Sequence, residues 1–555
     1  MSQFVSHNIP AGASLSNGRG SVTSAGGSLP NGRGSVTSAG GSLSNGRGSV
    51  ASACTFRAAR KRARKFLPCA VVGLALIGFG CMKGPNYQRP TAAVPQAYKE
   101  APPEGWKEAQ PNDGVLKGKW WEIFGDPALN ALEEQVNISN QNVLQVEAQF
   151  RQAVAAVRVA RTALFPTVTT SPSATGQGTS SRVSTGGISR GNTVAGLYEI
   201  PVSASYTADV WGAIHRSVTA SANTAQSLAA AIENARLLYQ SELATDYFQL
   251  HGLDGDHDLL LQTVNSYQDY LKLTKVRFAG GVASDSDVSE AETQLYTTQA
   301  QLVDVDVERN QMEHAIAILI GKPPTELTIP RQVIQSDPPK VPIGLPSQLL
   351  ERRPDIADAE RQAAAANQQI GIAQAAFFPT LTMAATAGVE SGNVLNLISW
   401  PARFWTIGPQ LAQILFDAGK RKAQVAEAQA SYDATAAAYR QSVLTAFQQV
   451  EDNLSTLRVL EQESAVTDQA VKSATRSVDV TTAQYKGGTV NYLSVIQVQT
   501  IALADQKSAV DLRTRRMAAS VALIQALGGG WDSTKLPGVQ DVGDTPVHIL
   551  PFLKH

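Results

Sequence analysis

The feature that most constrains the fold of this chain is an internal duplication, in which short motifs recur in the same order at a nearly constant distance. The motif pairs are ALFPT at 163–167 with AFFPT at 376–380, DVWG at 209–212 with FDAG at 416–419, RFAGGV at 277–282 with QYKGGT at 484–489, and AILIG at 317–321 with IQALG at 524–528. The first pair is 213 residues apart and the other three are 207 apart. The chain is therefore two copies of one unit of about 200 residues, and not the several unrelated domains that its length would suggest.

Each copy carries the periodicity of a long helical hairpin. Among ten positions spaced alternately three and four residues apart, eight are apolar between 288 and 319, and eight are apolar between 495 and 526. A repeat of this kind predicts a coiled-coil seam. Residues 212–278 contain no proline and predict the preceding helix, with a length of roughly 100 Å at 1.5 Å per residue. Each copy therefore predicts two long helices joined by a turn at a glycine pair.

Between the FPT motif and the next glycine motif of each copy, the period changes to two. Residues 202–210 and 405–412 alternate between apolar and more polar side chains, which predicts strands with two unlike faces. The Thr-rich stretches 167–176 and 380–388 predict their partner strands. Each copy therefore predicts a two-stranded hairpin between helices.

The predicted junctions between helices and strands lie at Pro166, Pro379, Gly212 and Gly419. Proline disfavours helix at the residue before it, so each FPT motif ends a helix. Four strands are too few to close a membrane barrel, for which about eight is the smallest number. An open sheet edge in lipid leaves backbone groups without hydrogen bonds. If these strands enter a membrane, the chain must oligomerise.

The first 80 residues are unlike the rest of the chain. Residues 1–56 contain a 14-residue repeat rich in Gly, Ser and Asn, which predicts disorder because it buries too little apolar surface. We interpret it as an over-extended translation start or translated repetitive DNA, in preference to a flexible tether. The basic run from Arg57 to Lys65 and the apolar stretch 66–80 predict a secretory signal peptide over 57–80.

The signal peptide precedes Cys81, in a context that resembles a bacterial lipoprotein processing site. The match is imperfect, since Gly78 stands where Leu is usual. Cys54 and Cys69 fall in the removed part, which leaves Cys81 as the only cysteine of the mature chain. We expect a covalent lipid on Cys81, palmitate included, and the alternative is an ordinary thiol in the apolar stretch. By the same resemblance, Met82 at the second mature position permits export to the outer membrane.

The charge and the motifs argue against several functions. The 47 basic and 47 acidic residues balance, but nine of the basic ones and none of the acidic ones lie in the first 80 residues, so residues 81–555 carry a charge of −9. We expect no nucleic-acid partner. The sequence has no Walker A, H-E-x-x-H or CxxC pattern, and His251 and His257 are poorly spaced for one helix face. We expect no enzyme, no metal and no cofactor other than the lipid on Cys81.

Several further motifs occur in a fixed order along the mature chain. They are CMKGPNYQRP from Cys81, KWWEIFGDPALNALEEQV from Lys119, the two FPT motifs, TADVWG from Thr207, LLERRPDIADAE from Leu349, and ALGGGW ending at Trp531. With these motifs the chain resembles the TolC-like outer-membrane factors of tripartite efflux systems, and among them the lipoprotein subfamily of RND-type systems. The resemblance covers residues 81 to about 535.

The resemblance implies a mainly α fold with a small β part. Long antiparallel coiled-coil helices would form a periplasmic α-barrel, and a homotrimer would share one transmembrane β-barrel of twelve strands, four from each chain. The implied first repeat covers 128–320, with a β-hairpin at 166–211 and a helical hairpin at 212–320. The second repeat covers 354–528, with a β-hairpin at 379–418 and a helical hairpin at 419–528. Equatorial segments precede, connect and follow the repeats at 81–127, 321–353 and 529–555.

The resemblance also implies a passive function in the outer membrane. The channel would be the exit duct for small molecules such as drugs or toxic compounds, an inner-membrane RND-type pump would supply the energy, and a periplasmic adaptor would dock on the helical tips. One alternative is the exit duct of a type I protein-secretion system, but the lipoprotein signal and the RRPDI string favour small-molecule efflux. A trimeric coiled-coil adhesin or structural stalk would explain the heptads but not the strand hairpins.

The resemblance assigns two groups of functional residues. The adaptor-docking tips would be Arg277, Phe278, Gly280, Gly281, Val282, Tyr485, Gly487, Gly488 and Thr489. The periplasmic aperture would lie at Leu493 and Gln497, although the family usually has Asp where Gln497 stands, which predicts weaker cation binding at the closed end. Asp285, Asp287 and Glu290 on the other hairpin would supply negative charge there instead, or would only complement the dipole of their own helix.

Overall fold

The computed structural model describes residues 82–100, 118–178, 194–342 and 346–544. All of them belong to one compact unit, Gly73–His555. The repetitive segment, the signal peptide and Cys81 lie outside the described residues, and so does the end of the equatorial tail.

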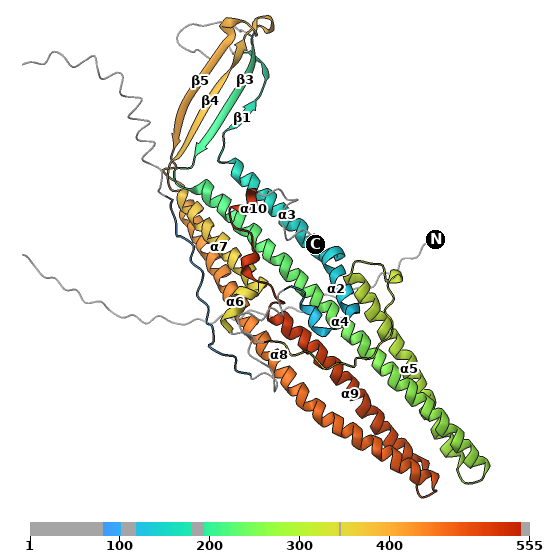
Figure 1. The fold of residues 1–555 in the computed structure, drawn as a ribbon. Coiled ribbons are helices and arrows are strands. Elements are labelled where there is room, and N and C mark those ends of the chain that lie inside the picture. Colours follow the sequence, from blue (N-terminus) through green and yellow to red (C-terminus); the bar gives the residue numbers. More distant parts are fainter. Residues whose placement is uncertain (1–81, 101–117, 179–193, 343–345, 545–555) are drawn as a thin grey trace, which may run out of the picture. The chain divides into compact units, whose positions relative to one another are not determined.

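The duplication is visible in the lengths of the helices (Figure 1). In the first copy, three strands are preceded by α2 (Pro127–Ser139) and α3 (Gln141–Thr162) and followed by α4 (Ala213–Ala279) and α5 (Asp285–Leu319). In the second copy, two strands are preceded by α6 (Leu349–Arg352) and α7 (Pro354–Ala375) and followed by α8 (Lys420–Lys486) and α9 (Tyr492–Ala526). Helices α3 and α7 each have 22 residues, α4 and α8 each have 67, and α5 and α9 each have 35. The two copies therefore fold alike.

The strands of both copies join in one antiparallel sheet. They are β1 (Thr167–Thr170), β2 (Ser173–Gly178), β3 (Val194–Ala208), β4 (Thr380–Ser391) and β5 (Arg403–Ala412), in the order β1-β3-β4-β5, with β2 also paired to β3. The pairing of β3 with β4 runs from Tyr198 opposite Ser391 to Ala208 opposite Leu381 and connects the two copies. The stretch 167–176 pairs with the strand that follows it, as expected, but it is interrupted at Pro172, which lacks a backbone N–H. The two parts, β1 and β2, keep one register against β3, with Thr167 opposite Ser205 and Ser173 opposite Glu199.

The long helices pack along the predicted seams. Every one of the ten positions counted in α5, and of the ten in α9, is buried or partly buried. Helix α4 contacts α3, α5, α7 and α9, and α8 contacts α7 and α9. The four long helices end together at the far side from the sheet (Figure 1). Among the described residues, none of the helices combines the length and the apolar character needed to cross a membrane.

The largest hydrophobic cluster lies midway along the helices, where the two copies meet. It includes Trp120 and Trp121 of the short helix η2 (Trp120–Phe124), Leu129 of α2, Tyr247 of α4 and Tyr439 of α8. The other short elements are η3 (Pro324–Glu326), η4 (Pro346–Gln348), η5 (Val394–Asn396), η6 (Trp400–Ala402), η7 (Ser533–Lys535) and α10 (Asp541–Asp544). The sheet lies at one end of the long helices and the hairpin turns at the other, with this cluster between them.

Candidate functional site

The turns of the two helical hairpins are built by matching glycines. The amide of Gly280 donates to Val276 O over 3.0 Å, and the amide of Gly487 donates to Ala483 O over 3.0 Å. The next glycine of each pair, Gly281 or Gly488, has a φ of 74° or 76°. Side chains with a Cβ rarely adopt this left-handed conformation, so the glycine pair is what closes each turn.

The first turn presents apolar side chains to its surroundings. Val276, Phe278 and Val282 are exposed at the end of α4 and in the turn. Tyr485 of the second turn is different, since it is only 3% exposed and its ring centroid lies 5.5 Å from that of Tyr492. Of the residues assigned to the tips, Phe278 and Val282 therefore offer an apolar surface, whereas Tyr485 supports the turn from within.

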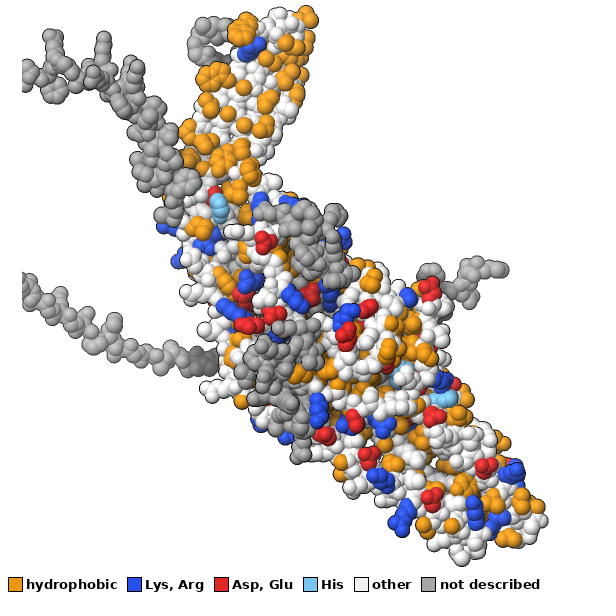
Figure 2. Space-filling view, viewed as in Figure 1, with side chains coloured by type: hydrophobic (Ala, Val, Ile, Leu, Met, Phe, Trp, Pro, Cys, Tyr) orange, Lys and Arg blue, Asp and Glu red, His pale blue; other side chains and the backbone are white. Residues whose placement is uncertain are grey.

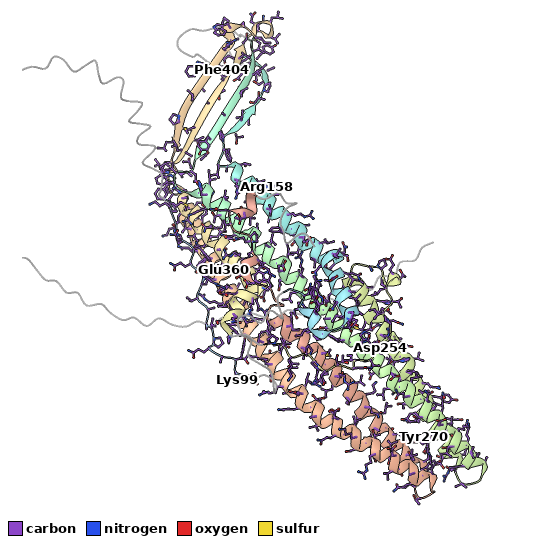
Figure 3. All side chains as sticks on the ribbon, viewed as in Figure 1. Lys99, Arg158, Asp254, Tyr270, Glu360 and Phe404 are labelled. Atoms are coloured by element: carbon purple, nitrogen blue, oxygen red, sulfur yellow. The ribbon has the colours of Figure 1, made fainter. Side chains whose placement is uncertain are left out.

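Arg277 ties the two hairpins to each other. Its Nη1 donates to Tyr485 O over 3.0 Å and to Lys486 O over 3.4 Å, and its guanidinium lies 4.6 Å from the centroid of the Tyr485 ring. Further from the turns, the hydroxyls of Tyr270 on α4 and Thr482 on α8 are 2.9 Å apart (Tyr270 is labelled in Figure 3). The helix ends of the two copies are thus bonded within one chain, a contact that the duplication alone does not indicate.

The residues assigned to the aperture lie at the starts of α5 and α9. Leu493 and Gln497 are exposed on α9. Asp287 forms a capping box with Ser284: the Ser284 amide donates to Asp287 Oδ2 over 2.8 Å, and the Asp287 amide donates to Ser284 Oγ over 3.2 Å. Asp285 is exposed and, among the described residues, has no ion-pair partner. Asp287 therefore caps its helix, whereas the carboxylate of Asp285 remains open to a partner.

At the other end of the helices, aromatic residues join the sheet to the helices. Trp211 stacks on Phe378 with ring centroids 4.6 Å apart, and its Nε1 donates to Pro379 O over 2.8 Å. Pro166 and Pro379 lie between the end of a helix and the start of a strand, and Gly212 and Gly419 lie directly before α4 and α8. The predicted junction residues therefore all lie at this boundary.

The start of the described chain is bound to the same boundary. The amide of Lys83 donates to Trp211 O over 3.3 Å, and its Nζ lies 5.3 Å from the centroid of the Phe378 ring. A Cβ on Gly212, whose φ is 77°, would come within 2.5 Å of Met82 Cγ. Residues 82 and 83 are thus held at the level where the sheet meets the helices.

From there, residues 82–100 run along α7 and α8 towards the middle of the helices. Tyr87 Oη donates to Glu360 Oε1 over 2.7 Å, and the amides of Lys99 and Glu100 donate to Glu451 over 2.7 and 2.9 Å. Burial and the bond to Glu360 raise the pKa of Tyr87. Glu360 and Lys99, labelled in Figure 3, mark the course of this segment.

In the middle of the helices, a buried group of charges holds the linker between the copies. Arg309 of α5 donates from Nε to Asp254 Oδ1 over 2.7 Å and from Nη2 to Ile329 O over 2.7 Å. His251 Nδ1 donates to Asp254 Oδ2 over 2.9 Å, and the amide of Gln332 donates to the same oxygen over 3.1 Å. Burial alone would raise the pKa of Asp254, but the bonds from His251 and Arg309 keep it below its usual value.

The duplicated position in α9 also reaches the linker. Arg516 is 207 residues after Arg309, and its Nη1 lies 3.5 Å from Asp337 Oδ1. Nearby, Arg513 Nη1 donates to Ile334 O over 3.1 Å. Arg309 and Arg516 are polar residues at matching positions of the two apolar seams, and this is the sequence signal for their contacts with the linker. Among the described residues, no group of three or more His, Cys, Asp and Glu is placed to hold a metal ion.

Known proteins resemble this chain along most of its length. A profile of the family described as outer membrane efflux protein matches residues 132–322 and 345–529. The pyoverdine export outer membrane protein OpmQ of Pseudomonas aeruginosa is 30% identical over 443 residues, which cover 78% of this chain and 92% of OpmQ. The probable efflux pump outer membrane protein TtgC of Pseudomonas putida is 29% identical over 475 residues, which cover 83% of this chain and 96% of TtgC.

The folds also agree. The solved structure of the outer-membrane channel OprN superposes with a TM-score of 0.73 at 26% identity, covering 81% of this chain and 99% of OprN. The CmeC outer membrane channel of Campylobacter jejuni superposes with a TM-score of 0.78 at 20% identity, covering 85% of this chain and 98% of CmeC. The long paired helices with a small sheet at one end are therefore a fold that this chain shares with OprN and CmeC.

Proposed function

Because the chain belongs to the outer membrane efflux protein family, we propose that it is the outer-membrane exit duct of a tripartite efflux system for small molecules. Its relatives include a protein that exports pyoverdine and a probable efflux pump component, and neither name refers to protein secretion. The observation that carries the proposal is the duplicated pair of 67- and 35-residue helices, which spans from the sheet to the hairpin ends. The chain forms a passage, and its energy comes from an inner-membrane RND-type pump.

The duct is a homotrimer. The sheet of one chain has two outer strand positions, β1 with β2 at one and β5 at the other, and neither has a second neighbour among the described residues. On β5, Trp405, Ile407 and Leu411 point to one face and are all exposed, while Thr406 and Gln410 alternate with them. Three such sheets closed into one barrel place the apolar face towards lipid and the polar face towards the bore.

The hairpin ends receive a periplasmic adaptor. Exposed Val276, Phe278 and Val282 supply an apolar surface for it, and the glycines of the turn permit close approach of another backbone. Tyr485 and Arg277 hold the two hairpins in a fixed relation beneath this surface. The aperture lies just above, at the exposed Leu493 and Gln497 of α9.

The mature chain is anchored in the outer membrane by a lipid on Cys81, and it extends into the periplasm. Support for the anchor comes from Met82 and Lys83, which follow Cys81 directly and lie beside Trp211 and Gly212 at the sheet–helix boundary. A diacylglycerol on the preceding residue would thus lie at the level of the membrane surface. Cys81→Ala should abolish palmitate labelling, and label retained on the variant would refute lipidation at this residue.

The duct function is tested in a host that lacks its own outer-membrane efflux channels. The chain is expressed with the adaptor and pump encoded beside its gene, and the minimal inhibitory concentrations of dyes and antibiotics are compared with those of cells that have only the adaptor and pump. We expect tolerance to rise at least fourfold only when all three are present. Equal tolerance with and without the chain would contradict the proposal, and restored secretion of a protein would favour a type I duct.

A further inference from the structure

The surface at the sheet–helix boundary combines two kinds of exposed side chain. Directly after β5, Leu415 is 91% exposed and Phe416 is 86% exposed. Lys420 and Lys422 follow at the start of α8; both are exposed and, in the part of the chain that the structure describes, neither has an acidic partner. Apolar side chains thus lie beside unpaired positive charges at one level of the molecule.

The local structure holds this arrangement in place. Asp417 accepts from the amides of Gly419 and Arg421 over 3.1 and 3.2 Å and from the Arg421 guanidinium. Arg421 Nη2 also donates to Ile414 O over 2.9 Å, which fixes the turn between the strand and the helix. Because Asp417 is occupied by Arg421 and by backbone groups, it does not neutralise the two lysines.

The position of the lysines is electrostatically unfavourable for the helix itself. The first turn of α8 contains Lys420, Arg421 and Lys422 and no acidic residue. The partial positive charge of a helix N-terminus repels cations placed there. Asp417 is the carboxylate bound at this helix start, and it pairs with Arg421. An anionic partner outside the chain would offset the charges of Lys420 and Lys422, which have no ion-pair partner among the described residues.

The surroundings place this surface at a membrane boundary. Figure 2 shows hydrophobic side chains over the sheet and charged side chains over the helices, with the change at the base of the sheet. Lys83 adds a further cation at this level, over the ring of Phe378. Aromatic residues with neighbouring lysines are typical of the interface between lipid and water, where the apolar stems enter the lipid and the charges stay at the headgroups.

We propose that Leu415, Phe416, Lys420 and Lys422 form a binding site for anionic phospholipid headgroups of the membrane leaflet that faces the periplasm. The two apolar side chains enter the acyl region, and the two ammonium groups bind the headgroup phosphates. The proposal rests on the outer-membrane location of the proposed function. It adds a lipid preference that the anchor on Cys81 and the sheet by themselves do not provide.

The test uses the full mature protein, purified in a mild detergent and titrated with phosphatidylglycerol, cardiolipin or phosphatidylethanolamine. Native mass spectrometry counts the bound lipids and reports the oligomer mass in the same spectrum. Each lysine near an anionic headgroup contributes about fivefold in affinity, so Lys420→Gln with Lys422→Gln should weaken binding of the two anionic lipids by at least about tenfold. Binding of phosphatidylethanolamine should not change.

Two control variants make the result specific. Lys472→Gln with Lys486→Gln removes the same charge from exposed positions farther along α8, and it should leave lipid binding unchanged. Lys420→Arg with Lys422→Arg keeps the charge and should keep the preference. Equal anionic-lipid binding by the wild type and the Lys420→Gln, Lys422→Gln variant would overturn the proposal.

The same measurements distinguish the lipid site from a contact between copies and from the proposed duct function. Loss of the oligomer mass in the Lys420→Gln, Lys422→Gln variant, without loss of lipid preference, would assign the surface to a second copy of the chain and reject the lipid site. If the wild type fails the drug-tolerance test but binds anionic lipid selectively, the duct function is wrong and the lipid site stands. If tolerance is restored but no lipid preference is found, only the lipid site is wrong.

Discussion

At the scale of single residues, the buried charged groups carry the clearest consequences. Glu133 of α2 is fully buried, and neither of its carboxylate oxygens has a hydrogen-bond partner among the described residues. Burial raises its pKa well above the usual value. The folded protein therefore holds the proton that the unfolded chain releases, so stability is full below the unfolded pKa and falls as the pH rises towards the folded one.

Replacing this group should remove the pH dependence that it causes. Glu133→Gln should stabilise the protein above pH 6, by about 1 to 3 kcal/mol, because the amide is neutral without binding a proton, whereas burial of Glu133 costs about 1.4 kcal/mol for each pH unit above its unfolded pKa until its raised folded pKa is reached. The gain should shrink towards pH 4.5. Thermal unfolding of the purified protein across this pH range provides the measurement, with Glu134→Gln as a control because Glu134 is exposed and pairs with Lys119. A gain that does not vary with pH would contradict this account.

Gln497 leads to a prediction about ion passage. It stands on the exposed side of α9 near Leu493, at a position where the resemblance leads us to expect a carboxylate. Gln497→Asp should increase cation selectivity and block by divalent ions, since three copies would add three negative charges at a narrow point. Single-channel recording in planar bilayers measures both properties. The idea fails if Gln497→Asp leaves them unchanged, and Asn491→Asp at the cap of α9 is a control for added charge alone.

At the scale of elements, the linker between the copies depends on charges that the long helices bury. Arg309 joins α5 to Asp254 of α4 and to the backbone of the linker at Ile329. Removing one partner of a buried pair leaves an uncompensated charge, so Arg309→Met should cost about 3 to 5 kcal/mol. The linker also contains a matched exposed pair, Arg331 with Asp306, in which both side chains are 42% exposed.

The exposed pair provides the control, because solvent screens it. Arg331→Gln should cost no more than about 1 kcal/mol. Chemical denaturation of the detergent-solubilised protein compares the two variants. The pKa of Asp254 is lowered, so the contribution of its contacts is present above the unfolded pKa and is lost as the pH falls through the folded one. Equal destabilisation by Arg309→Met and Arg331→Gln would show that burial does not set the strength of these contacts.

At the hairpin ends of the helices, the contact between the copies is made to backbone carbonyl groups and not by a buried charge pair. Arg277 connects the hairpins through carbonyl groups of Tyr485 and Lys486, so this contact depends on backbone position. Its place in the first copy corresponds to Gln484 in the second, and the two copies are therefore unlike where the proposed adaptor meets them. Amide hydrogen exchange at both turns should be faster in Arg277→Gln. Lys275→Gln, which breaks the exposed pair with Glu292, should leave it nearly unchanged.

At the scale of the whole molecule, the proposed barrel shared by three chains predicts which strand positions can be cross-linked within one chain and which between copies. Ser203 Oγ and Thr386 Oγ1 are 3.1 Å apart on β3 and β4, so Ser203→Cys with Thr386→Cys should form a disulfide within one chain. A cysteine at Thr169 on β1, combined with one at Thr406, Gly408 or Gln410 on β5, should instead link neighbouring copies. For at least one of these β1–β5 cysteine pairs, non-reducing electrophoresis should show bands of one, two and three linked chains and none larger. A ladder that is absent throughout would contradict the shared barrel.

Much of this architecture could be predicted from local patterns. The duplication, the seams of α5 and α9 and the glycine turns depend on residues close in sequence, and periodicity records them directly. Pro172 is a sequence signal for the break in the first strand, but it lies in a Thr-rich stretch whose composition favours one continuous strand. The contacts of Arg309, Arg277 and Met82 could not be assigned, because each joins segments that are distant in the sequence.

The repeat, the order and approximate lengths of the long helices, the presence of strands, and the family of the chain could all be read from the sequence. The three-dimensional arrangement was needed to show that β3 pairs with β4 so that both copies share one sheet, and that Tyr485 turns inward while Phe278 stays exposed. It was also needed to show that Lys420 and Lys422 have no ion-pair partner among the described residues. The physical reason is that periodicity reports which side of an element is apolar, whereas burial and charge pairing depend on which elements come together in space.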